Sequence, residues 1–312
     1  MENLIFSINV VLPIALTMCL GAFLRFIKIF DAYFLRTGNN FTFKVLLPTL
    51  LFYNIYKSNI SESVNFKFII YAVGMALAVI LAVCIIVLKK KETNENRGIL
   101  IQALYRSNFV LFGVPLSKNL FGEESLAIVT TLVAIIIPLY NFMAVILLDH
   151  FSNDISDYKK KILSIIKNPM IISSLLGIFL SLLGIKLPDF SEEVVGDLAG
   201  MASPLALMFL GGEIEIKKIT DNLPNIKFAV SGKLIIIPLI TLIISIFLGY
   251  RGVELGVLFS LFAPPCAVSC YTMAQQYDCN SELAGQLVFI TTMLCPFTIF
   301  VFIYFLKTLS FI

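Results

Sequence analysis

Asparagine, glycine and proline interrupt an apolar stretch at residues 106–115, which reads RSNFVLFGVP. Proline removes a backbone hydrogen-bond donor, and its ring clashes with the carbonyl four residues earlier. An amide side chain in apolar surroundings is costly unless it is hydrogen-bonded. Groups freed by such a break are stable only where they face a cavity or other protein. Asn108, Gly113 and Pro115 therefore predict a binding site at an opened helix.

A second break is predicted in LFAPPCAVSCYTMA, residues 261–274, where Pro264 and Pro265 are adjacent and Ser269 follows. Two helices opened at the same membrane depth would cross near the midplane. Their half-helix ends carry amides that are positive by the helix macrodipole and could hold a carboxylate. We expect a substrate site formed by Asn108, Gly113, Pro115, Tyr140, Asn141, Pro264, Pro265 and Ser269.

Tyr140 and Asn141 are polar residues within an otherwise apolar stretch. Two interpretations are open for them, a cavity-lining role or a hydrogen bond between helices. Lys44, Arg106 and Lys233 are basic residues inside apolar stretches, with no acidic residue at comparable depth. They either snorkel or brace helices, or they compensate the charge of an anion.

The elements that must position these residues are predicted to be membrane helices. The chain has 312 residues, 59% of them hydrophobic, with a mean hydropathy of +0.94. A spanning helix needs about 20 apolar residues, so the length allows ten spans and leaves no room for a soluble domain. This disfavours a soluble enzyme, a DNA-binding protein and a single-span receptor, and the net charge of +3 names no partner. The expected spans are 4–24, 39–57, 68–88, 98–118, 125–148, 168–186, 194–214, 225–248, 254–277 and 283–306.

The distribution of lysine and arginine predicts the orientation. Fourteen lie in the odd-numbered loops and six in the even-numbered loops and ends. By the positive-inside rule, the odd loops, including the linker 149–167, face the cytoplasm and both termini lie outside it. The acidic start, Met1-Glu2-Asn3, lacks the basic region of a cleavable signal.

An internal repeat relates the two halves at shifts of 154 to 158 residues. The matched pairs include Pro13 and Pro169, Gly21 and Gly177, Pro48 and Pro204, and Pro138 and Pro296. Because each half has five expected spans, an odd number, the second half would enter the membrane inverted. Inverted repeats are typical of secondary transporters. The expected units are a first five-helix repeat, residues 1–156, and a second, residues 157–312.

Cysteine and histidine usage points to no cofactor or metal. The six cysteines form no CxxC pair and indicate core packing. His150 is the only histidine, which excludes a histidine metal cluster. No paired acids or nucleophile–base set occurs at the expected membrane depth, so we do not expect an enzyme.

The motifs SNFVLFGVPL, APPCAVSCYTMA, VLPIALTMCLG and KNPMIISSLLG resemble those of the auxin efflux carrier family, whose bacterial members include malate and malonate permeases. The resemblance covers all ten expected spans. It implies an all-α membrane protein, a ten-helix inverted repeat with crossing, proline-broken fourth and ninth helices. A scaffold and a transport domain of elevator type, and a homodimer, are also implied.

The resemblance also assigns residues. The family's crossover asparagine falls on Asn108, its glycine and proline on Gly113 and Pro115, and its ninth-helix proline on Pro264 or Pro265. Its polar fifth-helix positions fall on Tyr140 and Asn141. Two features depart from plant members: residues 68–88 contain no acidic residue, and the long hydrophilic central loop is missing.

The leading prediction is a secondary carrier in the cell membrane for a small organic anion, either a dicarboxylate such as malate or malonate or an auxin-like monocarboxylate. Two alternatives stay open, a sodium-coupled bile-acid-type symporter and a membrane sensor that keeps the fold without turnover. The expected partners are the anion, the lipid bilayer and a second copy of the chain, with no nucleic acid.

Overall fold

The computed structural model describes residues 2–57, 65–152, 167–214 and 219–312, with side chains described from residue 12 onward. The helices, in chain order, are α1 (Glu2–Phe26), α2 (Ala32–Phe41), η1 (Thr42–Leu46), α3 (Leu47–Tyr56), α4 (Phe66–Leu88), α5 (Asn94–Tyr105), η2 (Phe109–Gly113), α6 (Val114–Phe121), α7 (Glu124–Phe151), α9 (Pro169–Leu183), α10 (Asp189–Glu213), α11 (Leu223–Ser231), η4 (Gly232–Ile236), α12 (Ile237–Phe247), α13 (Gly252–Phe262), α14 (Ser269–Gln276) and α15 (Ser281–Thr308). The elements marked η are π-helical turns.

The prediction of an all-helical membrane protein is confirmed in this coarse form. Five helical segments within the described ranges are long and apolar enough to cross a membrane: α4, α7, α10, the continuous segment Leu223–Phe247 and α15. Four further apolar stretches are shorter: Phe109–Phe121, Pro169–Leu183, Gly252–Phe262 and Leu12–Phe26, which is the part of α1 whose side chains the structure describes.

Several predicted boundaries shift. The second expected span begins early, at Ala32, because the Asp31 side chain accepts a hydrogen bond from Phe34 N and caps the helix. Arg36, expected in a loop, therefore lies on α2. The boundary between the expected halves, at 156/157, lies outside the described residues.

Each π-helical turn in the described chain is followed by a proline two residues after its end. Pro48 follows η1, Pro115 follows η2 and Pro238 follows η4. Proline has no N–H and crowds the carbonyl four residues back, so the turn before it widens to longer hydrogen bonds. The helix then continues beyond the proline.

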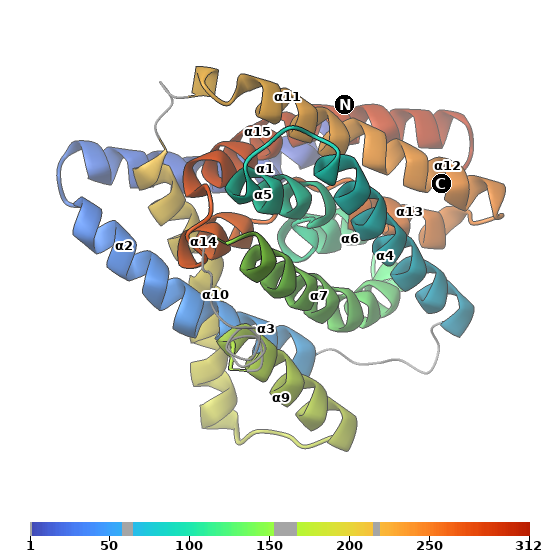
Figure 1. Cartoon of the computed structure of the whole chain (residues 1–312). Coiled ribbons are helices and arrows are strands. Elements are labelled where there is room, and N and C mark those ends of the chain that lie inside the picture. The colour runs from blue at the N-terminus through green and yellow to red at the C-terminus, as the bar shows by residue number, and fades with distance from the viewer. Residues whose placement is uncertain (1, 58–64, 153–166, 215–218) are drawn as a thin grey trace.

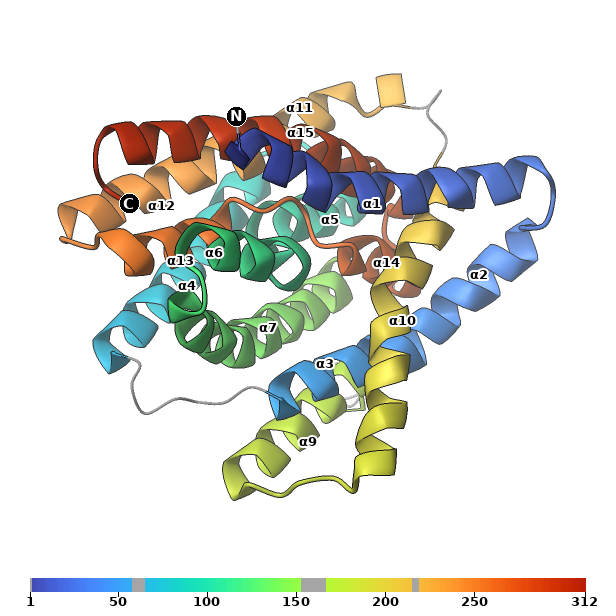
Figure 2. The ribbon, with the colours of Figure 1, turned by 180° about the vertical axis from the view of Figure 1, so that it is seen from behind.

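The helices form two groups (Figures 1 and 2). The first group, called here the frame helices, comprises α1, α2, α3, α9 and α10, with α1 packed along α10 and α3 along α9. The second, called the crossing bundle, comprises α4 to α7 and α11 to α15. α1 also contacts α15, and α14 faces α2, η1 and α10, so the groups meet along these helices.

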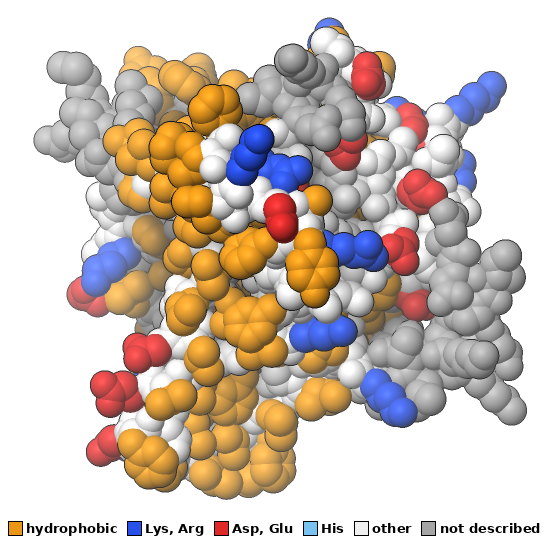
Figure 3. Space-filling view, turned by 90° about the vertical axis from the view of Figure 1, so that its left-hand side faces the viewer, with side chains coloured by type: hydrophobic (Ala, Val, Ile, Leu, Met, Phe, Trp, Pro, Cys, Tyr) orange, Lys and Arg blue, Asp and Glu red, His pale blue; other side chains and the backbone are white. Residues whose placement is uncertain are grey.

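Large apolar side chains remain exposed along the outer helices. Leu81 on α4, Leu176 on α9 and Phe297 on α15 are each more than half exposed. Figure 3 shows hydrophobic side chains spreading over one face of the molecule. Many large apolar side chains exposed together are unfavourable in water, and this surface matches one that faces lipid.

Candidate functional site

The two predicted breaks meet in space and pair through their backbones. α5 ends at Tyr105 and α13 ends at Phe262, and between them Ser107 and Cys266 form an isolated antiparallel bridge. Asn108 N donates to Pro265 O at 2.8 Å, and Ala267 N donates to Arg106 O at 3.1 Å. Each break thereby satisfies polar groups that the other one frees.

The first break lies at residues 106–108, which include Asn108 of the predicted set, and it ends before Gly113 and Pro115. Pro115 follows the π-helical turn η2 inside the continuous helical segment 109–121, so it widens that segment and does not end it. A side chain at Gly113 would clash with the Ser260 carbonyl of α13 and with the ring of Phe109. Gly113 therefore allows the two segments to approach each other closely.

A small cavity, called here the crossing pocket, opens beside the paired breaks. Its volume is about 70 Å³, enough for a few water molecules. Residues 109–111 and 267–269, at the starts of η2 and α14, line it. The first amides of a helix have no partner within that helix, so two helix N-termini present positive ends to the pocket.

Three buried donors of the crossing pocket have no hydrogen-bond partner among the described residues: Asn108 Nδ2, Tyr140 OH and Asn141 Nδ2. The orientation of Asn141 is fixed, because its Oδ1 accepts from the guanidinium of Arg106, which can only donate. A buried unpartnered donor costs about 1–3 kcal/mol. Three such groups on one cavity need acceptor atoms from outside the protein, either from water or from a ligand.

Arg106 is buried beside this pocket and contributes a positive charge. Its side chain is 4% exposed and donates to Gln102 Oε1 at 2.9 Å, to Met273 Sδ at 2.7 Å and to Asn141 Oδ1. It forms no ion pair with a carboxylate in the described part of the chain. Because the side chain is buried and bonded within the bundle, it does not snorkel.

Lys233 is fully buried behind the paired breaks and does not line the pocket. Its Nζ donates to Ser107 Oγ at 2.5 Å and lies 3.5 Å from the Phe262 carbonyl. Since Ser107 belongs to one break and Phe262 ends the helix before the other, the lysine ties the two segments together. Lys44, in contrast, is exposed on η1 and lines a separate pocket.

Comparison of the chain with models of protein families identifies its family. The family model described as "Membrane transport protein" matches residues 6–156 and again residues 155–303. The chain belongs to this family. It is the auxin efflux carrier family that the motifs resemble, so this prediction is confirmed.

Proteins similar in sequence to this chain are also described as transporters. An uncharacterized transporter of Methanocaldococcus jannaschii is 26% identical over 295 residues, 91% of this chain and 94% of the relative. One of Methanothermobacter thermautotrophicus is 24% identical over 297 residues, 92% of this chain and 94% of the relative. A protein of Rhizobium meliloti described as "Putative malonate transporter" is 25% identical over 142 residues, 45% of this chain and 44% of the relative. The chain is thus a multi-pass membrane transport protein.

The site residues predicted from the sequence fall into two sets in the structure. Asn108, Tyr140, Asn141 and Ser269 line the crossing pocket together with Arg106. Gly113, Pro115, Pro264 and Pro265 do not line it and instead shape the paired breaks.

Polar residues outside the predicted set also reach the pocket: Ser107 from the first break, Ser203 from α10 and Asn54 from α3. Ser107 lies between two residues that the sequence did single out. Ser203 precedes Pro204, one of the repeat prolines. The frame helices thus contribute one wall, which no motif at the breaks indicates.

Proposed function

We propose that this membrane transport protein carries small organic anions, dicarboxylates such as malate or malonate or auxin-like monocarboxylates, and binds them in the crossing pocket. The observation that carries the proposal is the convergence of Asn108 Nδ2, Tyr140 OH and Asn141 Nδ2, all unpartnered, beside Arg106. A carboxylate offers acceptors to such donors. No Asp or Glu lines this pocket among the described residues, so the field there favours an anion over a cation.

The dicarboxylate class receives support from one relative. The Rhizobium meliloti protein is described as a malonate transporter, with the qualification "Putative", and matches 45% of this chain. Malonate is therefore the first substrate to test, with malate and indole-3-acetate beside it.

Alternating access through two inverted halves, 1–156 and 157–312, is part of the proposal. The family model matches the chain twice, at 6–156 and 155–303. Glycines of the repeat also have matching surroundings. Gly21 of α1 contacts the backbone of α10, and Gly177 of α9 contacts that of α3. If the first and second expected spans correspond to the sixth and seventh, the contact of Gly21 with α10 is equivalent to the contact of Gly177 with α3.

We propose further that the frame helices form the scaffold and the crossing bundle moves against it as an elevator. The crossing pocket, at about 70 Å³, lies between the two groups and has walls from both. A whole dicarboxylate needs more room, so binding and release require the groups to separate. Such a movement would carry the pocket toward either membrane surface.

The arrangement in the membrane is proposed from the lysine and arginine distribution and from the family. The odd-numbered loops face the cytoplasm and both termini lie outside it. The protein resides in the cell membrane, and two copies associate as a homodimer.

The test is flux into liposomes that contain the purified protein. Wild-type protein should take up malonate, malate or indole-3-acetate and produce a current or potential. Asn108→Ala removes a hydrogen bond to a charged ligand worth about 1.5–3 kcal/mol. This should reduce transport by about 10- to 150-fold while the folded yield stays unchanged. Asn119→Ala, an exposed asparagine of the same half-helix, is the matched control.

Each other outcome has a definite meaning. Flux that requires sodium would favour the bile-acid-type symporter, and binding without flux would favour a sensor. Unchanged transport by Asn108→Ala would exclude the crossing pocket as the substrate site.

A further inference from the structure

A second pocket lies between α2, η1 and the C-terminal half of α14, and we call it the α2–α14 pocket. Its volume is about 480 Å³, several times that of the crossing pocket. Its lining includes Arg36, Lys44, Asn39, Thr272, Gln275 and Asp278. All the side chains that line it carry a charged, amide or hydroxyl group. An anion of several heavy atoms fits this space.

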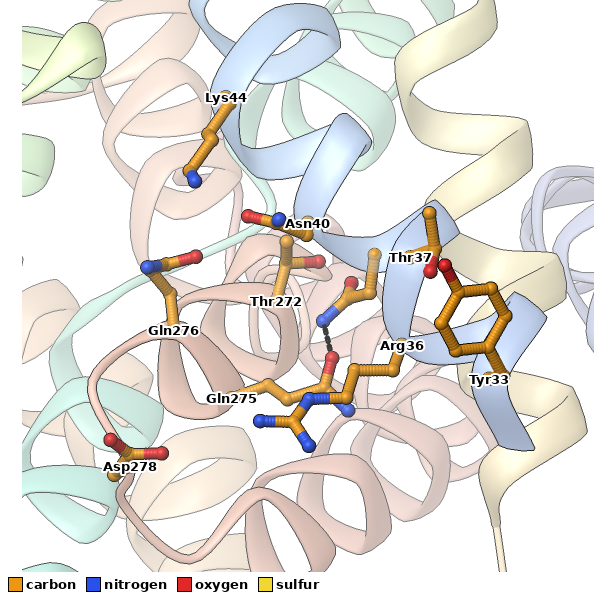
Figure 4. Close-up of a pocket in the computed structure, with 10 residues that line it drawn as sticks. Tyr33, Arg36, Thr37, Asn40, Lys44, Thr272, Gln275, Gln276 and Asp278 are labelled. Carbon is orange, nitrogen blue, oxygen red and sulfur yellow. Dashed lines mark hydrogen bonds between the residues drawn. The ribbon is translucent and has the colours of Figure 1, made fainter.

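The charge balance of the α2–α14 pocket is positive. Figure 4 shows Arg36 and Lys44 reaching from the α2–η1 segment toward α14. Neither cation forms an ion pair with a carboxylate of the described residues. Asp278, at the far end of the pocket, is the acidic residue in its lining. Two cations against one carboxylate favour an anionic ligand.

Two nearly inaccessible side chains of the pocket keep unpartnered atoms. Thr272 Oγ1 and Asn39 Oδ1 have no hydrogen-bond partner, and the residues are 0% and 2% exposed. The threonine hydroxyl can donate to a carboxylate. Unpartnered buried groups are costly in a folded protein, and both atoms belong to residues that line the pocket.

The amide orientations follow from Glu213 of α10. Its carboxylate, which accepts only, receives hydrogen bonds from Gln275 Nε2 at 3.0 and 3.1 Å. Gln275 Oε1 therefore turns toward Asn39 and accepts from its Nδ2. This leaves Asn39 Oδ1 as an acceptor for a ligand hydroxyl or a water molecule.

Both pockets lie along the boundary between α14 and the segment α2–η1–α3, which is called here the seam. α14 begins at Ser269 in the crossing pocket, and Thr272 and Gln276 reach the α2–α14 pocket about 5 and 10 Å further along the helix. On the facing segment, Lys44 lines the α2–α14 pocket while Leu47 and Leu51 line the crossing pocket. An anion in the wider pocket is thus close to the site at the breaks.

We propose that the α2–α14 pocket is a loading site, where a small carboxylate binds to Arg36, Lys44 and Thr272 before it enters the crossing pocket. This inference rests on the proposed function and adds a second, weaker binding site on one side of the membrane. The loading site raises the local anion concentration at the seam. It changes the apparent affinity for substrate that arrives from the side of the membrane to which the α2–α14 pocket opens. It leaves the maximal rate of transport unchanged.

The experiment measures malonate uptake as a function of concentration, with malonate applied from each side of oriented proteoliposomes. Arg36→Gln combined with Lys44→Gln should raise KM about 5- to 20-fold from one side, with the maximal rate within twofold. The effect should shrink at high salt, because exposed charges are screened. Lys91→Gln, an exposed lysine outside the pocket, should change nothing.

Asp278→Asn should act in the opposite direction and lower KM about two- to threefold. Asp278 has a positive φ of 49°, and asparagine tolerates that conformation better than most residues, so the backbone is preserved. A raised KM in Asp278→Asn, or an unchanged KM in the double variant, would overturn the loading site.

A binding measurement separates this proposal from the proposed function. Calorimetric titration of Asn108→Ala with malonate should retain weak binding, and adding the two substitutions at Arg36 and Lys44 should abolish it. Asn108-dependent transport with no such weak binding would refute the loading site alone. Absence of both malonate binding and carboxylate transport in the wild type would refute the proposed function as well.

Discussion

In the frame helices, glycines bring helix backbones into contact, whereas the crossing bundle holds polar and charged side chains in its centre. A side chain at Gly21 of α1 would clash with the Met208 carbonyl of α10, and one at Gly211 would clash with the Met18 carbonyl. In the crossing bundle, the breaks are surrounded by buried Arg106, Lys233 and Asn141. Both buried cations of the described residues belong to this bundle.

This difference predicts separate roles for the frame helices and the crossing bundle. Helices in backbone contact cannot slide without opening a close-packed interface. Polar groups at opened helices can exchange partners, because a ligand or water can replace a protein donor or acceptor. We expect the frame helices to respond to mutation in stability and the crossing bundle to respond in transport.

The largest effect is expected from Lys233→Met, which keeps an unbranched apolar chain as far as Cε and removes the ammonium. Ser107 Oγ and the Phe262 carbonyl would lose the donor that ties the two breaks. Hydrogen bonds to charged groups contribute about 1.5–3 kcal/mol, so we expect about a 10- to 150-fold loss of malonate transport. The measurement is flux into proteoliposomes at equal protein density.

Lys227→Met is the matched control, since Lys227 is exposed on α11 within the same helical segment. It should transport like the wild type. Full transport by Lys233→Met would show that the breaks hold their geometry without the lysine and would weaken the contrast between the two groups.

The next effect is expected in the frame helices. Gly21→Ala introduces a methyl group against the Met208 carbonyl, and overpacking of this kind costs about 1–3 kcal/mol. Thermal unfolding in detergent, followed by circular dichroism, should therefore occur at a lower temperature. Transport per folded molecule should change much less.

Gly74→Ala on α4 provides the comparison, because nothing lies within 4 Å of a Cβ atom placed there. Alanine favours helix over glycine by about 1 kcal/mol, so this variant should be as stable as the wild type or slightly more so. If both alanine variants melt alike, α1 and α10 are not held by their close approach.

The smallest effect concerns the turn between α4 and α5. Burial raises the pKa of the Glu92 carboxyl, but hydrogen bonds from Lys90 and Asn96 lower it more, so the pKa lies below its usual value of 4.5. A lowered pKa stabilises the folded state above pH 4.5, and that contribution is lost as the pH falls through the folded-state pKa.

Glu92→Gln should reduce stability by about 0.2–1 kcal/mol at pH 7 and flatten the loss of stability between pH 5 and 3. Melting temperatures across this pH range measure the effect. Glu123→Gln, at an exposed ion pair with Lys118, should change the melting temperature at pH 7 less than Glu92→Gln does. A wild-type profile in Glu92→Gln would assign the acid sensitivity to other carboxyls.

The sequence predicted the helical class, the family and the neighbourhood of both breaks, because apolar length and proline act locally. It predicted the first break within residues 106–115, and the structure locates it at residues 106–108. The helix stops at Tyr105 because backbone pairing with residues 265–267 replaces its own hydrogen bonds. That pairing partner lies about 160 residues away in the chain, and no local pattern indicates it.

The sequence by itself determined that apolar helices dominate this chain, that prolines interrupt them and that bases lie inside them without acids. Only the tertiary structure decided what each base does. Arg106 borders the crossing pocket, Lys233 ties the breaks together and Lys44 faces the α2–α14 pocket. Helix propensity and hydropathy depend on neighbours along the chain, whereas the partner of a buried charge is set by helices that meet only in the folded protein.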